Sequence, residues 1–185
     1  AKEGTELATQ VPSLMMGESM MDASTGFDTV KYREPMGVFA GIVPVNFPAM
    51  IPFGWMTPTC VACGNTIVLK AASFTPRTAL RIAELYKEAG MPDGVVNVIT
   101  CSRNEINTLL DHPDIKGITF VGSTPVGKIV YERAAKAGKR VQALCQAKNH
   151  ALILEDAPIE RTVAGIINSA YGCAGQRCMA LSACV

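Results

Sequence analysis

The chain has 185 residues, of which 49% are hydrophobic and 18% charged, and its formal net charge is +1. This composition predicts one domain with a sizeable core plus a smaller second piece, and it argues against disorder and against nucleic acid as a partner. The longest apolar run, residues 36–58, is interrupted by glycine, proline and asparagine, so we expect no membrane span and no membrane partner. Seven irregularly spaced cysteines favour reduced thiols in an intracellular compartment.

Residues 1–35 are rich in methionine and weakly periodic, which predicts an incomplete N-terminal segment with a hairpin arm over 29–33. From residue 36 onward the pattern alternates between strand and helix. The predicted strands are 37–44, 66–70, 95–99, 117–121, 141–144 and 151–154, and the predicted helices are 50–62, 78–88, 105–110, 125–137 and 158–170. Successive βα units predict an α/β fold with a doubly wound, Rossmann-like parallel sheet, which binds ligands at the carboxyl ends of its strands.

Two short motifs far apart in the chain suggest covalent catalysis. Gly175-Gln176-Arg177-Cys178 lies near the C-terminus, and Pro44-Val45-Asn46-Phe47-Pro48 lies far upstream. A cysteine attacks a carbonyl carbon as the thiolate, and the resulting oxyanion needs a preorganised donor, which an asparagine amide supplies together with a backbone N–H. These residues predict Cys178 as the nucleophile and Asn46 as its partner.

A third motif, residues 120–128, predicts a strand that feeds a helix, with Thr124 as the N-cap and Pro125 at the first helical position. Such a helix N-terminus suits a phosphate, although a simple capped helix remains an alternative. The run nearly matches a P-loop, but Ile129 replaces the magnesium-binding hydroxyl, which argues against a nucleotide hydrolase. The usual glycine fingerprint for dinucleotides is absent, so a bound dinucleotide requires a variant mode. We expect no metal site, because the Cys-x-x-Cys pair at residues 60–63 has no second ligand pair.

These motifs occur in the order and spacing of a known family: from residue 36 to 185 the chain resembles the NAD-dependent aldehyde dehydrogenases. Residues 46–50, 147–150 and 175–180 are similar to the CoA-acylating methylmalonate-semialdehyde dehydrogenase branch. The resemblance implies an NAD-binding domain over 36–152 and the beginning of a catalytic domain, with the nucleophile, over 153–185. It also implies a fragment of a longer cytoplasmic or mitochondrial-matrix enzyme, a homodimer or homotetramer, and we expect the piece alone to have no useful turnover.

The resemblance implies roles for individual residues. Cys178 becomes the nucleophile, and Asn46 and the Cys178 N–H form the oxyanion hole. Arg177 is a separate candidate to bind the substrate carboxylate, because a guanidinium group pairs bidentately with a carboxylate, and the alternatives for Arg177 are a structural salt bridge or tuning of the thiolate alone. The residues implied to bind NAD are Pro44, Lys70, Ser73, Gly122, Ser123 and Val126. Lys70 is assigned to the adenosine ribose and Ser123 to the pyrophosphate.

One departure from the family decides how the acyl group is expected to leave. Hydrolytic members carry a glutamate that activates water where this chain has Leu144. A thiol needs little help from a base, so we expect CoA to collect the acyl group after NAD-dependent oxidation of a malonate or methylmalonate semialdehyde and loss of carbon dioxide. Two alternatives stay open: an aldehyde dehydrogenase that releases the free acid, and a non-catalytic dinucleotide-binding module.

Overall fold

The computed structural model describes residues 1–102 and 104–185. Its centre is a five-stranded sheet in the order β5-β4-β3-β6-β7, and every neighbouring pair is parallel. The strands are β3 (Val38–Ile42), β4 (Thr66–Lys70), β5 (Val96–Ile99), β6 (Ile115–Val121) and β7 (Arg140–Leu144). The chain order along the sheet reverses between β3 and β6, which makes this pair the topological switch point of a doubly wound sheet. The predicted fold class is confirmed.

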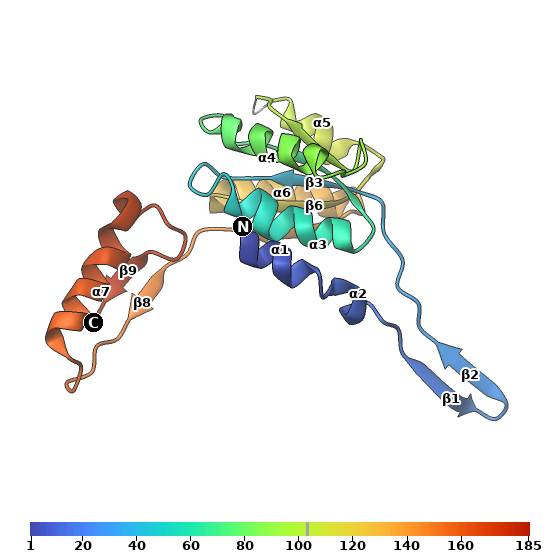
Figure 1. The fold of residues 1–185 in the computed structure, drawn as a ribbon, viewed down its shortest axis with the longest axis horizontal. Coiled ribbons are helices and arrows are strands. Elements are labelled where there is room, and N and C mark those ends of the chain that lie inside the picture. The colour runs from blue at the N-terminus through green and yellow to red at the C-terminus, as the bar shows by residue number, and fades with distance from the viewer. Residues whose placement is uncertain (103) are drawn as a thin grey trace.

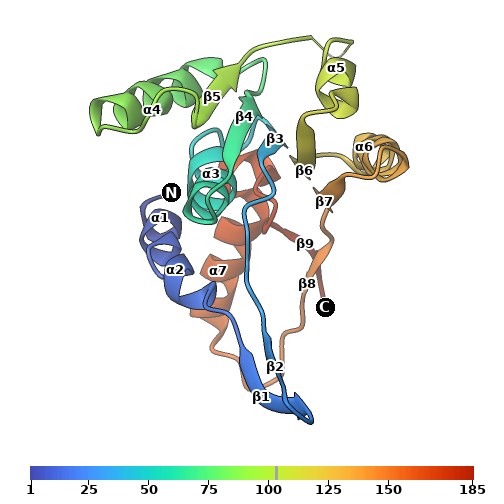
Figure 2. The ribbon, with the colours of Figure 1, turned by 90° about the vertical axis from the view of Figure 1, so that its right-hand side faces the viewer.

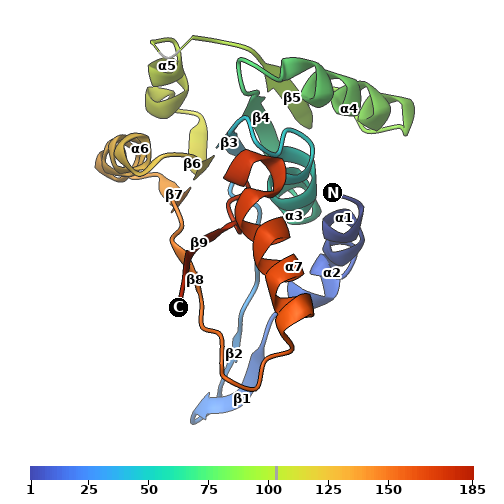
Figure 3. The same cartoon turned by 90° about the vertical axis from the view of Figure 1, so that its left-hand side faces the viewer.

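Helices cover both faces of this sheet, as Figures 2 and 3 show from opposite sides. On one face lie a π-helical segment, η1 (Ile51–Met56), its continuation α3 (Thr57–Ala62), and α4 (Pro76–Glu88). On the other face lie α5 (Ile106–Asp111) and α6 (Thr124–Lys136). The predicted helix over 50–62 is therefore present, but its first half is π-helical. Within the described residues, no helix has the length and apolar character needed to cross a membrane.

Each face has its own hydrophobic core, which explains why the strands are apolar on both sides. Ile67 and Leu69 of β4 are fully buried against η1 and α4. Ile118 and Phe120 of β6 point the opposite way and pack with Val130 of α6. Successive side chains of a strand alternate between faces, so a sheet covered by helices on both sides buries both sets.

The N-terminal segment differs from the prediction. It contains two short helices that the weak periodicity did not indicate, α1 (Lys2–Ala8) and α2 (Val11–Leu14), followed by the hairpin β1 (Ser19–Ser24) and β2 (Phe27–Val30). The hairpin projects away from the main body (Figure 1). The prediction of a hairpin arm over 29–33 was wrong in position, because the turn is at residues 25–26, where Gly26 has φ +77°.

The C-terminal part forms a separate group in Figure 1, joined to β7 by residues 145–148. It consists of β8 (Asn149–Ala151), α7 (Ile159–Tyr171), a 3₁₀ turn η2 (Gly172–Gly175) and β9 (Leu181–Cys184). The predicted strand over 151–154 was wrong: the strand lies earlier, and it pairs in parallel with β9, which sequence patterns did not indicate. The domain boundary at residue 152 stays a prediction.

Candidate active site

A pocket of about 870 Å³ lies where the carboxyl ends of β3, β6 and β7 meet the C-terminal group. Segments that are far apart in the sequence line it: residues 44–46, 121–123, 145–148, 175–178 and 180–182. Six of the predicted site residues therefore share one pocket, namely Pro44, Asn46, Gly122, Ser123, Arg177 and Cys178. The switch point of a doubly wound sheet is where such a site is expected.

Asn46 follows β3 and reaches the segment before Cys178, which the sequence predicts to be the nucleophile. Its Nδ2 donates a hydrogen bond to the carbonyl oxygen of Gln176, at 2.8 Å and across 130 positions of sequence. Its Oδ1 is buried, and no described residue donates a hydrogen bond to it. An amide nitrogen carries two hydrogens, so one remains for a further acceptor in the pocket.

The backbone before Cys178 is bent through three consecutive left-handed residues. Cys173, Ala174 and Gly175 have φ of +56°, +53° and +70°. Non-glycine residues in this region cost of order 1–3 kcal/mol each and persist where the surrounding structure imposes them. The next turn is closed by the Ala180 N–H, which donates to Arg177 O at 2.8 Å, and Cys178 lies inside it, partly buried.

Asn149, to which the sequence motifs gave no role, contacts this turn directly. Its Nδ2 donates to the carbonyl oxygens of Cys178 and Ala180, both at 2.9 Å. No local sequence signal identifies such a contact, since the two acceptors lie 29 and 31 residues away. Only the pairing of β8 with β9 brings them together.

The first turn of α6 forms another wall of the pocket. Ser123 is the N-cap, so the prediction of Thr124 in this role was wrong: Thr124 is already helical, and Pro125 comes second. The Ser123 hydroxyl makes no capping hydrogen bond, and the first intrahelical bond runs from Gly127 N to Ser123 O. The N–H groups before Gly127 lack helical acceptors, which makes this end a suitable site for an anion.

Three predicted cofactor residues do not line this pocket. Lys70 ends β4, and its Nζ lies 3.4 Å from the hydroxyl of Ser73 in the following loop. Val126 packs against the core on the α6 side of the sheet. Their roles stay predictions. A ligand at the switch point lies outside the carboxyl ends of the strands, and Lys70 is at that end of β4, next to β3.

Two cations line the pocket, Lys148 and Arg177. The guanidinium group of Arg177 lies against the backbone of Gly172 at the end of α7, where a β-carbon would be 3.0–3.2 Å from three of its atoms. Among the described residues that line the pocket, none is aspartate, glutamate or histidine. The pocket therefore offers positive charge and a thiol, but no carboxylate or imidazole base.

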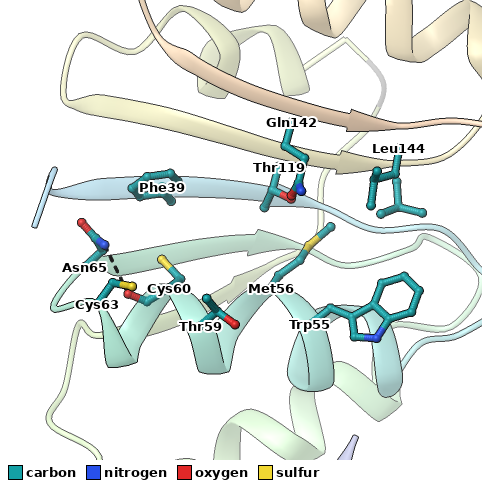
Figure 4. Close-up of a pocket in the computed structure, with 11 residues that line it drawn as sticks. Phe39, Trp55, Met56, Thr59, Cys60, Cys63, Asn65, Thr119, Gln142 and Leu144 are labelled. Atoms are coloured by element: carbon teal, nitrogen blue, oxygen red, sulfur yellow. Dashed lines mark hydrogen bonds between the residues drawn. The ribbon is translucent and has the colours of Figure 1, made fainter. Parts of the chain in front are cut away.

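Leu144 does not line the pocket that contains Cys178. It faces a neighbouring apolar hollow of about 470 Å³ (Figure 4). Trp55, Met56 and Cys60 reach this hollow from η1 and α3, opposite Phe39 and Leu144 on the strands. Burial raises the pKa of the Cys60 thiol to about 12, and nearby Cys63 adds to this shift. Cys60 is partly buried and packs against the hydrophobic core on this side of the sheet. No group of three or more His, Cys, Asp or Glu side chains suited to a metal occurs among the described residues.

The chain is similar to known proteins over nearly its whole length. The model of the aldehyde dehydrogenase family matches residues 2–185. Malonate-semialdehyde dehydrogenase 2 of Geobacillus kaustophilus is 53% identical over 183 residues, which cover 99% of this chain and 38% of the relative. The chain thus spans less than half the length of that relative.

Two solved structures are also similar. Methylmalonate-semialdehyde dehydrogenase from Oceanimonas doudoroffii superposes with a TM-score of 0.94 at 43% identity, over 98% of this chain and 37% of the other. A Sinorhizobium meliloti protein, assigned as a methylmalonate-semialdehyde dehydrogenase and solved in complex with NAD, gives 0.94 at 42% identity over the same shares. The chain belongs to the aldehyde dehydrogenase family.

Proposed function

We propose that the protein carrying this chain oxidises malonate or methylmalonate semialdehyde with NAD, through a thioester on Cys178, and transfers the decarboxylated acyl group to CoA. One observation carries the proposal: Cys178, Asn46 and two cations line one pocket in which none of the described lining residues is an acid or a histidine. The malonate-semialdehyde dehydrogenases, at 50–53% identity, support the same substrate class.

The first step uses the thiol and its donors. The Cys178 thiolate adds to the aldehyde carbon, and the carbonyl oxygen becomes an oxyanion. The second hydrogen of the Asn46 amide and the Cys178 N–H are the donors for this oxyanion. Removal of one such donor costs about 10²–10³ in kcat in well-studied enzymes. The existing bond from Asn46 to Gln176 O fixes the amide before the substrate arrives.

The chain also fits NAD. The unpaired N–H groups of the α6 first turn and the free Ser123 hydroxyl suit a pyrophosphate, and Lys70 with Ser73 offers donors to a ribose. Gly122, Pro44 and Val126 complete the proposed contacts. NAD bound there would supply the hydride acceptor for oxidation of the Cys178 adduct to a thioester.

The lining of the pocket favours a thiol over water for the release step. A water molecule needs a base, and the described lining residues include no carboxylate or imidazole to act as one. A CoA thiol, with a pKa of roughly 8.5 like that of cysteine, is partly ionised near neutral pH. Leu144, which faces the neighbouring hollow, has no proton-accepting atom.

Arg177 and Lys148 suit a substrate that carries a carboxylate. A guanidinium group pairs bidentately with a carboxylate and fixes its orientation. A carboxylate β to the thioester carbonyl can leave as carbon dioxide, because the carbonyl accepts the electron pair of the broken carbon–carbon bond. Protonation of the carbon next to the thioester carbonyl then gives an acetyl or propionyl thioester, whose acyl group is transferred to CoA.

The assay measures NADH and acyl-CoA formed by the full-length protein from each semialdehyde, with and without CoA. Cys178→Ala is expected to abolish both products, whereas Cys184→Ala in β9 is the matched control and is expected to retain them. Free acid accumulating equally fast without CoA would establish the hydrolytic alternative. NAD binding without any NADH formation would establish the non-catalytic one.

We further propose that the full-length protein is a homodimer or homotetramer, located in the cytoplasm or, in a eukaryote, in the mitochondrial matrix. The β1–β2 hairpin supports this assembly, since it projects from the body with its apolar residues Met20, Met21 and Phe27 at 62–82% exposure. Such patches mark protein contacts. Light scattering on the full-length protein and on a Met21→Lys, Phe27→Lys variant tests this, and an unchanged mass would refute the role of the hairpin.

A further inference from the structure

The nucleophile lies in a turn that is held from outside by one side chain. The turn is closed internally by the Ala180 N–H, which donates to Arg177 O at 2.8 Å. Both hydrogens of the Asn149 amide are engaged with the same turn, on the carbonyl oxygens of Cys178 and Ala180 at 2.9 Å. Asn149 begins β8 and lies opposite Leu181 in the parallel pairing with β9.

We infer that Asn149 is a positioning residue for the Cys178 thiol, an inference that rests on the proposed function for its kinetic consequence. A hydrogen bond to the Cys178 carbonyl fixes the peptide plane that follows Cys178. A second bond from the same nitrogen, to Ala180 O, fixes the far end of the turn. With both ends held, the direction of the Cys178 side chain is set before substrate binds, as preorganised catalysis requires.

The nucleophile segment is in fact held by amides on two sides. Asn46, which follows β3 of the large sheet, donates to Gln176 O at 2.8 Å. Asn149, from the small sheet, holds the turn two residues later. Both side chains act as donors to carbonyl oxygens, so neither of them occupies an N–H group of the segment. A side chain that accepted hydrogen bonds in place of Asn149 would consume these N–H groups or repel the two carbonyls.

The role of Asn149 is separable from folding. The β8–β9 pairing extends through backbone bonds that do not involve its side chain: Val185 N donates to Ala151 O at 3.0 Å, and Ile153 N donates to Val185 O at 2.8 Å. Loss of the amide therefore leaves the strands paired. The turn loses its outer contacts while the small sheet is retained.

Asn149→Asp tests the inference because it keeps the size of the side chain and replaces the donor with an acceptor. Asn97→Asp is the matched control: the Asn97 Nδ2 also donates to two backbone carbonyls, of Gly94 at 2.7 Å and Ile67 at 3.4 Å, but on β5. In the full-length protein we expect Asn149→Asp to lower kcat on the order of 100-fold with KM changed less than about threefold. Asn97→Asp should leave both within about twofold.

Alkylation of Cys178 by iodoacetamide, followed by mass spectrometry of its peptide, gives a readout that needs no turnover. We expect the rate at neutral pH to fall about tenfold in Asn149→Asp and also in the uncharged Asn149→Ala, with circular dichroism unchanged. An unchanged or faster rate in both would overturn the inference, and an effect confined to Asp would trace to its charge and overturn it too. If the wild-type protein oxidised no semialdehyde, the proposed function would fail, but the alkylation rates would still decide the role of Asn149.

Discussion

Asn65 joins the end of α3 to the entry of the central strand, and its replacement should destabilise the sheet that supports the pocket. The side chain is only 8% exposed. Its Oδ1 accepts hydrogen bonds from Met36 N at 2.7 Å and Gly37 N at 3.0 Å. Its Nδ2 donates to Cys60 O at 3.3 Å, the bond that is dashed in Figure 4. Asn65→Ala removes all three bonds at once.

The magnitude follows from these contacts. A hydrogen bond contributes about 0.5–1.5 kcal/mol net, so three bonds amount to about 1.5–4.5 kcal/mol. Met36 is 44% exposed, so water can reach this region and form some of the hydrogen bonds that Asn65→Ala removes. We therefore expect the free energy of unfolding to fall by about 2 kcal/mol, a large share of the roughly 5–15 kcal/mol typical of a domain.

Urea unfolding followed by circular dichroism measures this loss. Asn65→Asp is the matched variant, because it keeps both bonds to the backbone N–H groups and loses only the donor to Cys60 O. It should cost less than Asn65→Ala, about 1 kcal/mol. A loss below about 0.5 kcal/mol for Asn65→Ala, or a larger loss for Asn65→Asp, would refute the reasoning.

Three further outcomes are expected. With its pKa near 12, Cys60 should stay unmodified by iodoacetamide at about pH 8 in the folded chain while exposed thiols react, and labelling at the unfolded rate would contradict this. The Arg133 side chain lowers the pKa of Asp111, so their pairing stabilises the fold above about pH 4 and is lost as the pH falls further. Asp111→Asn should remove this loss of stability from the acid unfolding curve. An unaltered curve would show that the Asp111–Arg133 pair does not stabilise the fold. Gly172→Ala should push the Arg177 guanidinium aside slightly and raise KM for a semialdehyde about threefold at unchanged kcat, whereas an unchanged KM would count against the carboxylate contact.

The parallel sheet and most of its helices could be predicted from the sequence, because the apolar pattern of each strand or helix indicates which of its faces is buried. The predictions were wrong where the apolar pattern is weak, or where adjacent residues are equally suited to the same position. The hairpin near Gly26 is exposed along both strands, so no apolar alternation reveals its register. The cap of α6 moved from Thr124 to Ser123 because adjacent small polar residues satisfy the same local preference.

By itself, the sequence determined the fold class, and it supplied the prediction that Cys178 is the nucleophile with Asn46 as its partner. It also showed leucine, not glutamate, at position 144. Each of these features can be recognised in a short segment of the sequence, from its apolar pattern or from a motif. Only the tertiary structure decided that Asn149 holds the turn around Cys178 and that Leu144 faces a separate hollow. Such contacts depend on strand pairing and side-chain direction between segments tens of residues apart, and nothing in the local pattern of either segment specifies them.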